Sequence, residues 1–238
     1  MIKTRILYAL IFSLIYAQDV LASPGGMIFK TVQRSFWAKV VIIIIFLILL
    51  PFIIYLNYSE NRKIKKTQND LRRIAKSNPN FDWMMLKTRF KNVFLRVHQA
   101  WKKEDMKLAS EFMTNWYWQN QQMVYLDQWE EDGLLNICSV SDINSITPVH
   151  LEFANDGEGS RIVVQVNAIV EDYLVKRSTN EIVEGEKGFN TIDVLWTFIL
   201  KDNKWLLENI EESSSIFEYT KLKNIIPEKS ELSNKAFR

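Results

Sequence analysis

IDVLWTFILKDNKWLLENIE, residues 192–211, is the stretch that determines the fold class of this chain. Two runs rich in β-branched and aromatic residues flank a short polar segment, Lys201-Asp202-Asn203. Runs of this composition on either side of a polar turn are typical of a β-hairpin. We therefore predict two strands, 192–200 and 204–211, that pair with each other.

Two further strands are predicted upstream of this hairpin. Residues 161–176 carry apolar side chains at every second position from 164 to 170, which is the alternation of a half-buried strand. Residues 139–153 mix apolar residues with Ser and Thr, and they predict a strand interrupted near Pro148, because proline cannot donate to a ladder. Turn residues separate these runs. An antiparallel meander of about four long strands is therefore expected.

Helical periodicity precedes the strands. Phe90, Phe94, Val97 and Trp101 recur at spacings of four, three and four, which predicts a helix that ends near Lys102. A second helix is expected from Asp105, as its N-cap, to about Trp116. A third is expected over 118–131, with Gly133 as its C-cap.

Helices followed by an antiparallel meander predict an α+β domain over residues 81–212, with the helices on one face of a curved sheet. Long curved strands packed on a helix usually enclose a conical apolar pocket. Four aromatic side chains are expected to converge there, where they either line a pocket for a lipid tail or an apolar peptide segment or simply fill the core. These residues are Phe94, Trp116, Trp196 and Phe198.

Two apolar segments precede the domain. Residues 1–23 have a short basic start, an apolar run and small residues before Ser23, so they are either a signal peptide cut after Ala22 or Ser23 or an uncleaved signal anchor. The seventeen residues 40–56 are apolar apart from Tyr55 and Pro51. Because about twenty such residues match the hydrocarbon core of a bilayer, we predict a transmembrane helix over 36–57.

The charges beside this helix predict its orientation. Three basic residues lie between Ser23 and Lys39, and seven lie between Asn57 and Lys76. The positive-inside rule then places the C-terminal domain in the cytoplasm, on an inner membrane crossed once after signal cleavage. Residues 58–80 are interpreted as a basic linker that either contacts anionic lipids or serves topology alone. The residues expected to contact lipid are Arg62, Lys63, Lys65, Lys66, Arg72 and Arg73.

The residue inventory argues against catalysis. The chain has one cysteine, two histidines and seven scattered glycines, and neither a metal-ligand spacing nor a phosphate loop can be assembled from them. No nucleic-acid recognition motif accompanies the basic segment. We therefore expect no enzyme activity, no cofactor, no metal and no nucleic-acid partner. The tail, 213–238, is weakly amphipathic before Pro227 and is expected to dock on the sheet or on a partner.

Three stretches resemble the Tim44-like domain, a cone-shaped fold in the nuclear-transport-factor-2-like and cystatin-like group. They are Phe94–Asp105 with its Ala-Trp pair, Val170–Gly185, and the Trp-Thr-Phe strand with Trp-Leu-Leu-x-x-Ile after it in Leu195–Ile210. Val194 stands where the family tends to carry Glu two residues before that Trp. The resemblance covers roughly 81–212 and implies the cone fold.

The resemblance implies binding rather than chemistry. It points to a membrane-anchored protein that acts with an unidentified membrane or translocation-related partner, in protein translocation, membrane-protein assembly or quality control. A secretion-system scaffold subunit with a periplasmic cone domain is the first alternative, and the charge bias argues against it. A cone-fold enzyme is the second alternative, in which Asp172-Tyr173 would have to supply the chemistry.

Overall fold

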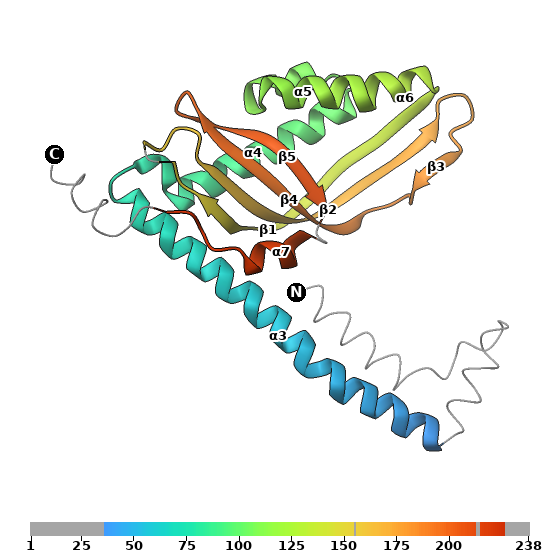
Figure 1. The fold of residues 1–238 in the computed structure, drawn as a ribbon. Coiled ribbons are helices and arrows are strands. Elements are labelled where there is room, and N and C mark those ends of the chain that lie inside the picture. Colours follow the sequence, from blue (N-terminus) through green and yellow to red (C-terminus); the bar gives the residue numbers. More distant parts are fainter. Residues whose placement is uncertain (1–35, 155, 213–214, 227–238) are drawn as a thin grey trace. The chain divides into compact units, whose positions relative to one another are not determined.

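The computed structural model describes residues 36–154, 156–212 and 215–226, without the side chains of residues 36–39 and 42 (Figure 1). The predicted signal segment 1–23 and the end of the tail lie outside these residues. The chain divides into two compact units, Met1–Ser59 and Glu60–Arg238. The boundary between them falls inside one helix, α3 (Phe36–Ala75).

The first part of α3 carries the predicted membrane span. Its side chains are mostly exposed, among them Ile45, Leu47 and Phe52. Among the residues that the structure describes, one helix is long and apolar enough to cross a membrane, and it is this one. Pro51 lies inside the helix without ending it. This helix is consistent with a membrane-anchored protein.

The last turns of α3 belong to the folded domain. Leu71 and Ile74 are fully buried and pack in the main core. The prediction of a separate basic linker over 58–80, with a domain beginning at 81, was therefore wrong at this boundary. The apolar residues of this helix change from continuous to sparse, and Leu71 and Ile74 are buried by packing in the core cluster that the helices and the sheet share.

The other helices precede the sheet. The helical elements after α3 are η1 (Pro79–Phe81), α4 (Trp83–Lys102), η2 (Met106–Phe112), α5 (Asn115–Gln121), η3 (Gln122–Leu126), α6 (Asp127–Glu131) and, after the sheet, α7 (Ile216–Lys221). Helix α4 begins where Asp82 accepts hydrogen bonds from the backbone N–H groups of Met84 and Met85. The expected N-cap Asp105 is confirmed, whereas the C-cap of α6 is Asp132 and the predicted Gly133 follows it at φ +68°. The segment after Asp105 is a 3₁₀-helix, so the predicted second helix is shorter than expected.

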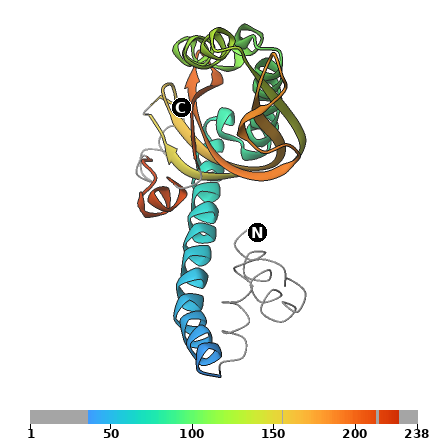
Figure 2. The same cartoon turned by 90° about the vertical axis from the view of Figure 1, so that its right-hand side faces the viewer.

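The sheet is antiparallel and curved, as Figure 2 shows. Its strands are β1 (Leu134–Glu152), β2 (Arg161–Lys176), β3 (Ile182–Gly185), β4 (Asn190–Lys201) and β5 (Lys204–Glu212). The order is β1-β2-β4-β5, with β3 paired to the end of β2. Strand β1 is longer than predicted and is not interrupted at Pro148, because the register shift directly after that residue accommodates it in an edge strand.

Helix α4 packs on the inner face of the sheet. Phe90 stacks on Phe198 of β4 with ring centroids 3.9 Å apart. Phe81 meets Trp205 edge-on at 5.4 Å, and the indole Nε1 of Trp205 donates to the carbonyl of Asn80 at 2.9 Å. These contacts confirm an α+β domain with helices on one face of a curved antiparallel sheet.

A smaller cluster lies on the outer face. Val149, Val163 and Leu195 pack there against Ile216 of α7. The residues after α7 continue along the edge of β1, where the N–H of Phe153 donates to the carbonyl of Ile225 at 2.7 Å. Of the two predicted roles of the tail, the described part therefore takes the first and docks on the sheet.

Candidate functional site

Three of the four aromatic residues predicted to line a pocket form a filled core. Phe94, Trp196 and Phe198 are each at most 1% exposed. The rings of Phe94 and Trp196 lie 4.8 Å apart, and those of Trp196 and Phe198 lie 6.2 Å apart. They leave no room for a ligand between them. The prediction that these residues line a pocket is therefore corrected: they are core residues.

Trp116 lies elsewhere and is 68% exposed. The spacing of apolar residues predicted that Trp116 and Phe112 share one helical face. In the structure η2 ends at Phe112 and a new helix, α5, begins at Asn115. Thr114 caps the new helix by accepting from the N–H of Tyr117. This break redirects Trp116 away from the core, so the helical spacing that grouped it with the core did not apply.

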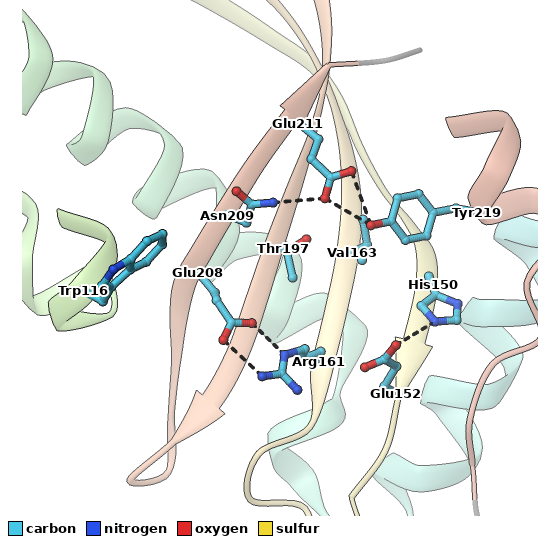
Figure 3. Close-up of a pocket in the computed structure, with 10 residues that line it drawn as sticks. All are labelled: Trp116, His150, Glu152, Arg161, Val163, Thr197, Glu208, Asn209, Glu211 and Tyr219. Carbon is cyan, nitrogen blue, oxygen red and sulfur yellow. Dashed lines mark hydrogen bonds and ion pairs between the residues drawn. The ribbon is translucent and has the colours of Figure 1, made fainter. Parts of the chain in front are cut away.

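Trp116 instead forms one wall of an open groove over the outer face of the sheet, drawn in Figure 3. The groove has a volume of about 460 Å³. Its floor comes from β2, β4 and β5, and α7 stands on the side opposite Trp116. The lining residues are Trp116, His150, Glu152, Arg161, Val163, Thr197, Glu208, Asn209, Glu211 and Tyr219.

The charged groups of the groove already hold one another. Arg161 donates to both carboxylate oxygens of Glu208, at 2.7 and 3.2 Å. The hydroxyl of Tyr219 donates to Glu211 at 3.2 Å. His150 Nε2 lies 3.3 Å from Glu152. Such pairs are the ordinary way to satisfy polar groups on a sheet surface.

Burial shifts the titration of two groups in the groove. Burial and the nearby charge of Lys63 lower the pKa of His150, with Glu152 opposing them. The ring is therefore neutral near neutral pH. Burial and the carboxylate of Glu211 raise the pKa of Tyr219 to about 12, so its hydroxyl stays a donor.

The predicted lipid-contact residues divide into two groups. Arg62, Lys65, Lys66 and Arg72 are exposed, and Arg73 is half-buried. Lys63 is buried: its Nζ donates to the carbonyl of Leu222 at 2.6 Å and to Asn224 Oδ1 at 2.8 Å. The prediction of lipid contact is therefore corrected for Lys63, which holds the tail instead. Its partners lie about 160 residues away in the chain, so no local pattern could have shown this.

The remaining reactive side chains are structural. Cys138 is buried, as expected, and burial raises the pKa of its thiol to about 12. His98 Nδ1 donates to the carbonyl oxygen of Phe94 at 2.8 Å, and burial lowers the pKa of His98 to about 4. Within the described residues, no group of three or more His, Cys, Asp or Glu is arranged to hold a metal ion.

Comparisons with known proteins identify the family of the domain. The family model of the Tim44-like domain matches residues 67–212, which is more than half of the chain. The intermembrane space region of the chloroplast protein ARC6 is a structural neighbour with a TM-score of 0.39 and 9% identity, covering 53% of this chain and 97% of that one. No curated protein matches the chain. The family match begins inside α3, in agreement with the burial of Leu71 and Ile74, and the chain belongs to the Tim44-like domain family.

Proposed function

We propose that this protein is a membrane-anchored, non-enzymatic binding protein that acts in protein translocation, membrane-protein assembly or quality control at the inner membrane. The observation that carries the proposal is the continuity of α3, which supplies both an apolar segment fit to cross a membrane and two core residues of the Tim44-like domain, Leu71 and Ile74. A domain built onto its own anchor suits a protein that works on partners at the membrane.

The surface of the domain supports binding. The groove over the outer face is open, and one of its walls is the exposed indole of Trp116. Tryptophan is among the residues most often found at the centre of protein interfaces. Met123 and Val124 are also exposed, about two turns further along the same helical stretch. We propose that this helical surface meets the protein partner.

The partner surface can be tested by photo-crosslinking in native membranes. A photoreactive phenylalanine analogue at Trp116 or Met123 is expected to give a discrete adduct with a protein of the membrane or of the translocation machinery. The matched control is the same analogue at Phe189, which is also apolar and exposed but lies just before β4. Adducts from Phe189 alone, or identical adducts from all positions, would contradict the proposed surface.

The proposed orientation places the domain in the cytoplasm. Arg62, Lys65, Lys66 and Arg72 are exposed beside the apolar segment and are available for topology and for anionic headgroups. Alkaline phosphatase fused at the end of the chain should be inactive, and a fluorescent protein fused there should fluoresce. The opposite pair of results would favour the secretion-system scaffold, whose domain lies outside.

The same four residues test the lipid contact. For this test the full chain is extracted in detergent and reconstituted at low density, and vesicles are then added in trans. Joint replacement of the four residues by Gln should weaken pelleting of the chain with anionic vesicles. It should leave pelleting with neutral vesicles unchanged. Added salt should have a similar effect on the native chain, because charges are screened over ~8 Å at physiological ionic strength. Pelleting that is unchanged by both the substitution and the salt would refute the proposed lipid contact.

A further inference from the structure

A second pocket lies at the other end of the domain, between the helices and the inner face of the sheet. Its volume is about 270 Å³. Aromatic side chains of α4, η3 and α6 form one side, namely Trp101, Tyr125 and Trp129. The opposite side comes from β1, β2 and β3 and presents three polar residues, Asn136, Asp172 and Glu184.

The polar side of this pocket carries two carboxylates and one amide. The Asn136 side chain hydrogen-bonds the carboxylate of Asp172. A carboxylate only accepts, so the amide nitrogen faces Asp172 and the amide oxygen faces away. That oxygen is buried and has no hydrogen-bond partner. An unpaired buried acceptor costs about 1–3 kcal/mol, and Asn136 lines the pocket, so a ligand that donates a hydrogen bond to this oxygen would remove that cost.

The charge of the pocket is negative. Burial and the charge of Glu184 raise the pKa of Asp172, and the hydrogen bond from Asn136 opposes them. The lining of the pocket carries two carboxylates, Asp172 and Glu184, and no Lys or Arg is among its lining residues. A positive group would therefore stabilise the carboxylates.

The aromatic side favours the same kind of ligand. The faces of Trp and Tyr rings carry negative potential, and a cation over them gains about 0.5–2 kcal/mol. Tyr125 and Trp129 lie with their ring centroids 5.9 Å apart at an angle of 58°. Two rings set at an angle present two faces to one small ligand.

A glycine holds the third strand against the pocket. Gly185 has φ +80°, and a Cβ there would approach the Asp172 carbonyl to 2.9 Å and the Tyr173 Cβ to 3.0 Å. Only glycine lets β3 come this close to β2. The preceding residue, Glu184, pairs with Leu174 and is thereby held at the pocket.

From these contacts we infer that the pocket binds a positively charged nitrogen group that donates hydrogen bonds, a guanidinium or a primary ammonium. A quaternary ammonium has no N–H to offer to Asn136 and the carboxylates. The volume suits one long basic side chain rather than a drug-sized ligand. The source is either an Arg or Lys side chain of a polypeptide or a small free amine.

This inference rests on the proposed function in one respect: it takes the domain to be a binding domain, and it adds the chemistry of the ligand. It is tested with defined probes on the full chain in detergent micelles. The probes are an uncharged-ended pentapeptide with central Arg, the same peptide with citrulline, and arginine methyl ester. Citrulline keeps the shape of Arg and replaces the guanidinium by a neutral urea group, so it isolates the charge.

The Arg peptide is expected to bind at least tenfold more tightly than the citrulline peptide. Asp172→Asn should weaken binding of the Arg peptide by about 10- to 100-fold, the range expected for a charge-assisted hydrogen bond. Glu218→Gln, which neutralises an exposed acid on α7, is the matched control and should leave binding unchanged. Circular dichroism of each variant shows that the fold is retained.

The ester distinguishes the sources. Equal affinity for the ester and the Arg peptide assigns the pocket to a small amine, and tighter peptide binding assigns it to a polypeptide side chain. Equal binding of the Arg and citrulline peptides, no binding of any probe, or an equal effect of Asp172→Asn and Glu218→Gln would each overturn the inference. None of these results bears on the fusion or crosslinking tests, so the two proposals can fail separately.

Discussion

The two ends of the sheet's inner face differ in what fills them. At one end the aromatic rings of Phe81, Phe90, Phe198 and Trp205 close on one another without a gap. At the other end the same face presents Asp172 and the buried, partly unpaired Asn136 to a pocket. Apolar packing contributes stability, whereas a buried acceptor without a partner costs it. The first end therefore stabilises the fold, and the second is the end at which we propose binding.

The largest effect is expected among the packed rings of the core. Trp196→Ala should reduce the free energy of unfolding by about 3–5 kcal/mol, because it leaves a cavity among packed rings. Trp116→Ala is the matched control, and since its ring is exposed the change should stay within about 0.5 kcal/mol. Urea unfolding of the full chain in micelles, followed by far-ultraviolet circular dichroism, measures both. Equal losses would contradict the distinction between core and groove.

An intermediate effect is expected from His98, which lies between the two ends beside Trp196 and Trp101. Burial lowers its pKa from 6.5 to about 4, so the unfolded chain binds the proton more readily between these values. Stability is then full above 6.5 and falls as the pH drops towards 4, by up to about 3 kcal/mol.

The measurement is urea unfolding of the native chain and of His98→Gln across that pH range. Glutamine does not titrate, so the variant should lose this part of the acid sensitivity while the carboxylates contribute equally to both proteins. The same slope in both proteins would show that His98 does not carry the effect.

The sequence predicted the closed end much better than the open end. The strands at 161–176 and 192–211 and the helix ending at Lys102 are found within about two residues of their predicted bounds, because alternation and helical spacing are local signals. In β2 the inner positions run Val164, Val166, Ala168 and Val170, and the acid Asp172 follows at the next inner position. That change from apolar to acidic was the signal for the pocket.

The other predictions that failed depend on features that the local spacing of apolar residues does not show. Trp116 turned outward because a helix ended and another began, which the spacing of apolar residues does not reveal. Lys63 is buried by partners in the tail. The resemblance to a family predicted the cone fold but not which residues lie on its surface. Sequence patterns predict which side chains face inward; which of them meet depends on the curvature of the sheet and on distant segments.

The smallest effect on stability, and the sharpest separation of the two ends, is expected for Asn136→Leu. The substitution removes the unpaired amide oxygen and fills the same space with an apolar side chain. Asp172 loses one hydrogen bond, but it is solvent-accessible and water can replace the donor. The free energy of unfolding should therefore stay constant or rise by about 1 kcal/mol, whereas binding of the Arg peptide should weaken. A residue whose loss stabilises the fold and weakens binding is maintained for the ligand. If Asn136→Leu instead destabilises the domain as much as Trp196→Ala does, the amide is part of the core, and the open end is not a binding site.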